Sequence, residues 1–198
     1  MEEFLKNVKE LSKNEKDYSQ SLRDESAEFL ADFCLCKKPK KVLEIGTNVG
    51  FSSLIILKNS EATLTTLEKD EHVYMQAKAN FAKAKVKSRV KQILGDAKQV
   101  LATLPKNYYD LIFLDGPKGQ YIKYLPLMIS LLKKGGYLIA DNVYFQGKVL
   151  QEGHIPHKHR TIVVNLRKFL TQIQDTNIFE TSLLDIDDGI SVSKKVCF

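Results

Sequence analysis

The sequence predicts an α/β fold in which a mostly parallel sheet carries helices on both faces and ends in an antiparallel hairpin. Short apolar runs typical of buried strands alternate with helical segments between Lys41 and Asp141, and this alternation requires right-handed crossovers between parallel strands. Near the C-terminus an Asp-Gly step joins two β-rich runs, which is typical of a hairpin. A length of 198 residues suits one domain with a full core.

The first residues, 1–38, predict a helical cover that precedes the main fold. Apolar side chains recur there at helical spacing in two stretches, and a polar run at residues 12–21 separates them. Pro39 ends this region, and residues 39–198 are expected to form the α/β core, with a basic insert around residues 143–160. No stretch has the composition of a domain linker, so we expect a single domain.

The core elements follow in a regular order. The glycine pair at residues 135 and 136 predicts a turn into the fifth strand. Strands are expected at residues 41–45, 62–67, 89–94, 109–115, 137–141, 178–184 and 190–193, and helices at residues 51–58, 71–84, 97–104, 121–132 and 161–174.

The composition is that of a soluble globular protein, with 43% hydrophobic and 27% charged residues. No apolar run approaches the ~20 residues of a membrane span, and the acidic start is unlike a signal peptide, so we expect a cytoplasmic protein without membrane association. The three cysteines form neither a disulfide framework nor a zinc pattern. A net charge of +6 permits an anionic partner such as RNA but does not require one.

Asp115 is the first candidate for a functional residue. It follows four consecutive apolar residues, 111–114, and Gly116-Pro117 ends the strand just after it. Ligands of open α/β sheets bind at the carboxyl ends of strands, so an acid placed there predicts a site. The alternative is an aspartate that stabilises a turn or caps a helix.

A glycine-containing turn follows the first predicted strand and opens a helix, which allows the backbone to approach a ligand closely. The turn lacks the lysine of a phosphate-binding Walker A loop, and Asn48 stands where a dinucleotide fingerprint has its middle glycine. Glu68 and Asp96 close the next two strands, where acids can bind a ribose and an adenine, although each could instead cap a helix. This combination favours an adenosine-type ligand without pyrophosphate, such as S-adenosylmethionine.

Motifs at these strand ends together resemble the metal-dependent O-methyltransferases of the catechol and caffeoyl-CoA type, over nearly the whole chain. The resemblance implies the Rossmann-like class I methyltransferase fold, whose seven-stranded sheet ends in an antiparallel hairpin, and it implies a homodimer. In chain order the motifs are Glu44-Ile45-Gly46, Gly50-Phe51-Ser52, Glu68, Gly95-Asp96-Ala97, Asp115-Gly116-Pro117-Lys118 and Asp141-Asn142.

The resemblance also implies S-adenosylmethionine as cofactor and assigns its contacts. The acid matching Glu44 faces the amino acid part of the cofactor, and Asp96 and Ala97 border the adenine. Gln20 and Leu22 match an N-terminal segment that closes over the cofactor. The complete set of matching positions is Gln20, Leu22, Glu44, Gly46, Ser52, Glu68, Asp96, Ala97 and Asp115.

Three further positions, Asp115, Asp141 and Asn142, match the metal ligands of that family. Two carboxylates and an amide oxygen at neighbouring strand ends form an oxygen-only site that suits Mg²⁺ (or Mn²⁺); the alternative for Asp141-Asn142 is ordinary turn chemistry. Lys118 corresponds to the lysine proposed as general base in the family, because a nearby dication lowers a lysine pKa. Its alternative is a solvated lysine.

The insert and the following helix are rich in cations, and a solvated basic loop is their simplest interpretation. The sharper hypothesis is a phosphate-binding rim of Lys148, Lys158, Arg160 and Arg167 beside the active site. A zinc site formed by histidines 154, 157 and 159 lacks a completing ligand. Residues 142–147, this insert and residues 187–190 are similar to the bacterial tRNA 5-hydroxyuridine methyltransferases.

The sequence therefore predicts an enzyme that methylates the 5-hydroxyl of the wobble uridine in the anticodon loop of tRNA. The 5-hydroxyl and 4-carbonyl oxygens of 5-hydroxyuridine chelate a metal as a catechol does, and Tyr144 or Phe145 would stack on the base or else form hydrophobic cover. Rival hypotheses are the same reaction on a catechol-like small molecule, a nicotinamide oxidoreductase, and a non-catalytic RNA-binding module.

Overall fold

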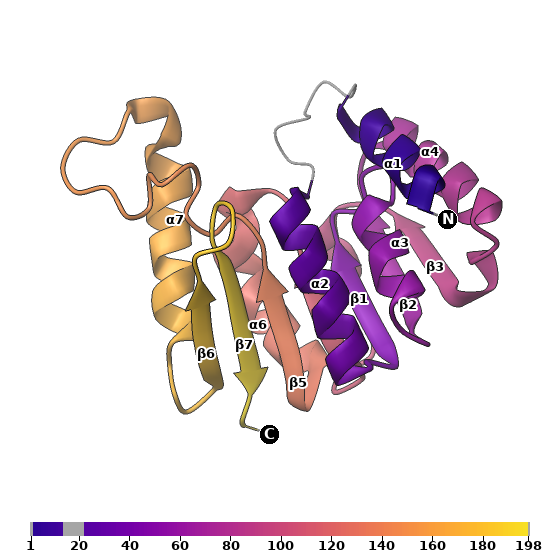
Figure 1. Ribbon diagram of the computed structural model, residues 1–198. Helices are drawn as coiled ribbons and strands as arrows, with labels where there is room; N and C mark the ends of the chain where they lie inside the picture. The colour runs from indigo at the N-terminus through magenta and orange to yellow at the C-terminus, as the bar shows by residue number, and fades with distance from the viewer. Residues whose placement is uncertain (1, 14–21, 198) are drawn as a thin grey trace.

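The computed structural model describes residues 2–13 and 22–197, and its centre is a seven-stranded sheet with helices on both faces (Figure 1). The strand order is β3-β2-β1-β4-β5-β7-β6, with β7 antiparallel to both of its neighbours. The strands are β1 Lys41–Ile45, β2 Thr63–Glu68, β3 Val90–Leu94, β4 Tyr109–Leu114, β5 Leu132–Ala140, β6 Phe179–Leu184 and β7 Ile190–Lys195. The predicted fold, with its C-terminal antiparallel hairpin, is confirmed.

The helices cover the two faces unequally. One face packs on α2 and α3, and the other packs on α5, α6 and α7. The α-helices are α1 Glu2–Lys13, α2 Asp24–Lys37, α3 Phe51–Lys58, α4 Glu71–Lys83, α5 Ala97–Leu101, α6 Tyr121–Leu131 and α7 His157–Ile173, with 3₁₀ turns η2 Lys87–Arg89 and η3 Lys118–Gln120.

The central strands divide their side chains between two cores. Leu111 and Phe113 of β4 pack on the α2–α3 side, whereas Ile112 and Leu114 pack on the α6–α7 side. All four side chains are at most 1% exposed. Successive side chains of a strand point to opposite faces, so an uninterrupted apolar run is what a strand covered on both sides requires.

The N-terminal cover consists of two helices with different roles. On α1, Val8 packs against α3 and α4 in a small separate cluster that includes Leu54 and Phe81. On α2, Leu30 and Phe33 pack directly on the sheet. No helix in the described ranges combines the length and apolar character needed to cross a membrane.

Three predicted boundaries were wrong. Strand β5 begins at Leu132, five positions before the expected start, because the glycine pair lies inside the strand at a register shift opposite β4. Helix α7 begins at His157, so Lys158 and Arg160 lie in its first turn and not in a loop. Helix α5 ends at Leu101 and is shorter than expected.

Candidate active site

A cavity of about 950 Å³ lies at the carboxyl ends of β1, β2, β3 and β4. The chain order reverses between β1 and β4, and such switch points hold the ligands of α/β sheets. Predicted cofactor residues that line this cavity are Leu22, Gly46, Ser52, Glu68, Asp96, Ala97 and Asp115. Gln20, the remaining member of the N-terminal segment, lies outside the described residues.

Gly46 allows the ends of β1 and β4 to meet at the cavity. Its φ is +101°, and a Cβ built on it would lie 2.2 Å from the carbonyl oxygen of Asp115. The Asp115 amide donates to the carbonyl of Ile45 at 3.0 Å, which holds the two strand ends together. Only glycine meets both requirements, so Gly46 fixes the position of Asp115 beside the turn.

Helix α3 begins at the cavity with its N-terminus uncapped by a side chain. Its N-cap, Gly50, has a φ of +89°, and a Cβ there would lie 2.8 Å from the ring of Phe81. Val49, Phe51 and Ser52, which surround this N-terminus, all line the cavity. The helix N-terminus therefore offers backbone N–H groups and a favourable field to an anionic group.

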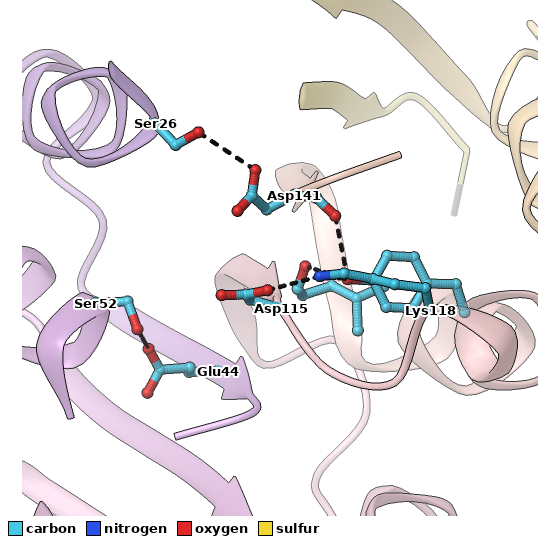
Figure 2. A network of polar contacts seen from close by, with 8 residues as sticks. Ser26, Glu44, Ser52, Asp115, Lys118 and Asp141 are labelled. Atoms are coloured by element: carbon cyan, nitrogen blue, oxygen red, sulfur yellow. Dashed lines mark hydrogen bonds and ion pairs between the residues drawn. The ribbon is translucent and has the colours of Figure 1, made fainter. Parts of the chain in front are cut away.

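Glu44 lies beneath the cavity and is fully buried. Its carboxylate accepts hydrogen bonds from Ser52 Oγ at 2.6 Å and Thr66 Oγ1 at 2.5 Å, and a third from the Ser53 hydroxyl. Burial raises the pKa of Glu44 to about 7, although the three hydroxyl donors lower it and only the charge of Asp115 adds to the rise. Glu44 thus acts on the cavity through Ser52, which lines it (Figure 2).

Glu68 and Asp96 combine backbone contacts with a place in the cavity wall. The Glu68 carboxylate accepts from the amides of Asn48 at 2.9 Å and Lys69 at 2.8 Å, while Asp70 caps α4. Glu68 is therefore no helix cap. Asp96 is the N-cap of α5, and its carboxylate accepts a hydrogen bond from the Lys98 amide at 2.8 Å. The alternative role of Asp96 as a helix cap is therefore confirmed, and the same residue also lines the cavity.

A second group of polar residues lies at the ends of β4 and β5 (Figure 2). Lys118 Nζ donates to Asp115 Oδ1 at 2.7 Å and to Tyr121 Oη at 2.9 Å. The Tyr121 hydroxyl lies 3.1 Å from the carbonyl oxygen of Leu114 and 3.2 Å from that of Asp141. Tyr121 therefore connects the two strand ends that carry the predicted metal ligands.

Asp141 is 1% exposed, and its two carboxylate oxygens have different surroundings. Oδ1 lies 3.4 Å from Ser26 Oγ, whereas the buried Oδ2 has no hydrogen-bond partner among the described residues. Burial, and then the charge of Asp115, raise the pKa of Asp141 to about 7. A buried carboxylate oxygen without a donor, close to a second carboxylate, fits a bound cation.

These features, a switch-point cavity with acids at three strand ends and a glycine turn, agree with a family comparison. The family model described as O-methyltransferase matches residues 1–196. The chain belongs to the O-methyltransferase family. It is therefore an enzyme that transfers a methyl group to an oxygen atom. The family match argues against the nicotinamide oxidoreductase, which the missing middle glycine of the turn already disfavoured.

Individual relatives agree with the family. The methyltransferase is 28% identical over 200 residues to the caffeoyl-CoA O-methyltransferase of Stellaria longipes, across 96% of this chain and 83% of that one. It is 33% identical over 115 residues to the catechol O-methyltransferase of Mycobacterium tuberculosis, across 57% of this chain and 52% of the relative.

A solved structure supports the cofactor. A methyltransferase of Podospora anserina, bound to S-adenosylhomocysteine, superimposes with a TM-score of 0.86 at 25% identity, covering 97% of this chain and 87% of that one. S-adenosylhomocysteine is what S-adenosylmethionine becomes when it loses its methyl group. That neighbour therefore holds the product form of this methyl donor.

Lys118 of the methyltransferase is buried together with Asp115, and each side chain is 7% exposed. Burial lowers the pKa of Lys118, but the nearby carboxylates of Asp115 and Asp141 outweigh burial and raise the pKa above its ordinary range. The protein groups alone thus hold Lys118 as an ammonium ion, the reverse of the lowered pKa expected beside a dication. Its role as general base stays a prediction.

The residues of the predicted basic rim lie beyond β5. Lys148 is in the loop that projects next to α7 (Figure 1), whereas Lys158, Arg160 and Arg167 lie on α7 itself. Lys158 and Arg160 are exposed, and Lys148 is half-buried with its Nζ 5.5 Å from the centre of the Phe145 ring. Arg167 donates from Nε to the carbonyl of Val149 at 2.9 Å and with a second nitrogen to Gln151 at 2.6 Å. Arg167 therefore holds the loop in shape, a role that the sequence did not indicate.

Two other interpretations of this region are resolved in part. Among the described residues, no group of three histidine, cysteine, aspartate or glutamate side chains is arranged to hold a metal, and the loop histidines belong to no such group. Tyr144 and Phe145 are half-buried against the core, as expected for hydrophobic cover. Stacking of either ring on a base stays a prediction.

Sequence reasoning missed several functional residues of the methyltransferase. Asn48 adopts a φ of +47° and lines the cavity, and its buried side-chain oxygen has no hydrogen-bond partner within residues 2–13 and 22–197. The residue type itself could have indicated this left-handed backbone conformation, because asparagine adopts it more readily than most other non-glycine residues. Ser26 gave no local signal, because its contact with Asp141 joins segments 115 residues apart, and Tyr121 contacts the carbonyl of Asp141 across 20 residues.

Proposed function

We propose that this enzyme uses S-adenosylmethionine and Mg²⁺ (or Mn²⁺) to methylate the 5-hydroxyl of 5-hydroxyuridine at the tRNA wobble position, giving 5-methoxyuridine. The main observation in favour of a bound metal is the buried Oδ2 of Asp141, which has no hydrogen-bond partner in the described part of the chain. The observation that favours RNA is the exposed cationic pair Lys158 and Arg160 on α7, in a region of residues 143–160 that holds a single acid, Glu152.

The cavity supplies a partner for each part of the cofactor. The uncapped N-terminus of α3 suits the carboxylate of its amino acid part, and Glu68 suits the ribose hydroxyls. Asp96 and Ala97 suit the adenine at the end of β3. Asp115 lines the cavity and also holds Lys118, so it joins the cofactor side of the site to the metal side.

Asp115, Asp141 and Asn142 would hold the cation. When bound, the cation would lower the pKa of the acceptor hydroxyl and fix its direction. The protein's own contribution is alignment: the acceptor oxygen must lie in line with the methyl carbon and the sulfur. Lys118 holds a proton at Nζ, 2.7 Å from Asp115, and Tyr121 fixes the lysine from the other side.

Methylation of purified substrates tests the acceptor. The enzyme is incubated with labelled S-adenosylmethionine, Mg²⁺ and either tRNA that contains 5-hydroxyuridine or a panel of catechols, and nucleosides are analysed by mass spectrometry. We expect 5-methoxyuridine from the tRNA. Its absence would overturn the proposed acceptor and leave the O-methyltransferase activity intact.

Salt dependence tests the basic rim. Each phosphate contact that is lost reduces the slope of log affinity against log salt by about 0.7 for single strands. We therefore expect Lys158→Gln and Arg160→Gln each to flatten the dependence of tRNA binding on salt, and Lys87→Gln, an exposed lysine on η2, to leave it unchanged. Equal slopes for the three variants would argue against the rim.

A catechol-like acceptor is the second candidate, and the names of the relatives favour it. A catechol and 5-hydroxyuridine both offer two adjacent oxygens to a metal, so the same site serves both. Methylation of a neutral catechol should barely change with salt, whereas methylation of tRNA should fall steeply.

The metal is tested by Mn²⁺ binding followed by electron paramagnetic resonance. Asp141→Ala should abolish binding of Mn²⁺ and methylation while S-adenosylhomocysteine still binds.

The homodimer and the cytoplasmic location also stay proposals. Light scattering of the purified enzyme tests the homodimer.

A further inference from the structure

The β6–β7 hairpin ends in a tip, residues 185–189, that lies against two segments of the active site. We propose that this hairpin tip positions both halves of the site, with Asp187 holding the start of α2 and Asp188 holding the chain that follows Asn142. The proposal rests on the cofactor cavity and the metal site described above. It assigns positioning roles to two acids that the sequence placed in the hairpin turn and in a stretch of family similarity, without a role for either side chain.

Asp187 caps a helix that begins 163 residues earlier. The N-cap of α2, Arg23, makes no side-chain capping bond, although a helix N-terminus leaves several N–H groups without partners. Asp187 Oδ2 supplies the acceptor: it accepts from the Ser26 amide at 2.8 Å and from the Ser26 hydroxyl at 2.8 Å. A carboxylate at this end of a helix is also favoured by the helix dipole.

The start of α2 touches both halves of the site. Ser26 Oγ lies 3.4 Å from Asp141 Oδ1, and Ser26 is 1% exposed. Leu22, just before the helix, lines the cofactor cavity and is 4% exposed. A shift of the helix start would therefore move a wall of the cavity and a neighbour of the metal ligand together.

Asp188 holds the other segment through side chain and backbone. Its carboxylate accepts from the amides of Gln146 at 2.7 Å and Gly147 at 3.3 Å. Its carbonyl accepts from the Tyr144 amide at 2.9 Å, and the carbonyl of Gly189 accepts from the Val143 amide at 3.0 Å. The chain immediately after Asn142 is thus bound to the hairpin tip.

The close approach of the tip to this segment requires a glycine. Gly189 has a φ of +84°, and a Cβ there would lie 2.4 Å from the ring of Tyr144. The tip and the segment after β5 therefore pack as one unit, in which Asp188 and Gly189 share the contact. The same tip reaches α2 through Asp187, so one turn fixes two segments that are otherwise far apart in sequence.

The test compares three alanine variants within the tip. Asp187→Ala and Asp188→Ala remove the two contacts. Asp185→Ala is the matched control, since Asp185 is an exposed acid of the same tip and takes part in neither contact. Binding of S-adenosylhomocysteine and of Mn²⁺ is measured by calorimetry. Hydrogen exchange is followed in residues 22–30 and 143–148.

We expect Asp187→Ala to weaken S-adenosylhomocysteine binding by about 5-fold, the effect of a lost helix cap, with faster exchange in residues 22–30. Asp188→Ala should weaken Mn²⁺ binding by about 10-fold, as loss of an outer partner of a metal ligand does, with faster exchange in residues 143–148. Asp185→Ala should change neither. Identical affinities and exchange in the three variants would overturn the proposal.

Two further variants separate positioning from general loss of stability. Asp187→Asn keeps an oxygen acceptor for Ser26, so it should recover most of the affinity that Asp187→Ala loses. Ser26→Ala combined with Asp187→Ala should cost less than the two single effects added, because both act through one contact. Additive effects would count against the proposal. If the wild-type enzyme binds no Mn²⁺, the proposed metal fails, while the cofactor and exchange measurements still test the role of Asp187.

Discussion

The cofactor half and the metal half of the active site are built in different ways. In the cofactor half, Ser52 and Ser53 bind Glu44 from eight and nine residues away, and Asp96 binds an amide two residues away. In the metal half, Asp141 contacts Ser26 across 115 residues, and Asp187 binds Ser26 across 161. Several contacts of the first half thus lie within one strand–turn–helix unit, whereas the contacts of Ser26 in the second half join segments that meet only in the finished fold.

Gly46 is the point where the two halves meet, and its replacement should have the largest effect. Gly46→Ala would place Cβ 2.2 Å from the Asp115 carbonyl oxygen at a φ of +101°. We expect a loss of about 3 kcal/mol or more in the free energy of unfolding, measured by denaturant titration. Gly153→Ala is the control, because its φ of +88° is similar but nothing lies within 4 Å, so it should cost about 1 kcal/mol. Equal losses would show that the close approach is unimportant.

Glu44 gives the cofactor half a pH dependence of its own, separate from that of Asp141 in the metal half. Its pKa is raised from 4.5 to about 7 in the folded protein, chiefly by burial. Between these pH values the folded protein keeps a proton that the unfolded chain has lost, so stability falls as pH rises through this window and then levels off.

We expect Glu44→Gln to remove a fall of about 3 kcal/mol from the stability profile between pH 4.5 and 7. The amide keeps an acceptor for the surrounding hydroxyls, so the variant should fold. Denaturant titrations at several pH values measure the profile for both proteins. Parallel profiles would mean that Glu44 is not protonated at the lower pH.

Tyr121 provides the corresponding test of the metal half. Tyr121→Phe removes the hydroxyl that lies between Lys118 and the carbonyl of Asp141, so buried polar groups lose a partner. We expect a loss of about 2 kcal/mol in the free energy of unfolding and a fall in methylation, with little change in S-adenosylhomocysteine affinity. Tyr108→Phe, at a 38% exposed tyrosine, is the control. A large loss of S-adenosylhomocysteine affinity in Tyr121→Phe would contradict the assignment of Tyr121 to the metal half alone.

The contrast also explains what the sequence could predict. The parallel sheet, the hairpin and the strand-end acids of the cavity follow from buried strands and glycine turns, which are local patterns. Leu22, Ser52 and Ala97 were expected only from the family resemblance. The predicted start of β5 was wrong because a glycine pair is compatible both with a turn before a strand and with a register shift inside one. Gly135 and Gly136 lie at such a register shift. The contact of Asp187 with Ser26 could not be predicted, since nothing near either residue indicates its partner.

The smallest effect concerns Cys34, which reports on how firmly α2 is held. Burial raises the pKa of its thiol to about 12, whereas Cys36 on the same helix is exposed. Iodoacetamide at pH 8 should therefore modify Cys36 and leave Cys34 unmodified in the folded enzyme, because the thiolate is the reactive form. Mass spectrometry of peptides after timed labelling measures both rates. Modification of Cys34 at the rate of Cys36 would mean that α2 leaves the sheet readily, and the metal half would then lack the fixed helix on which Ser26 depends.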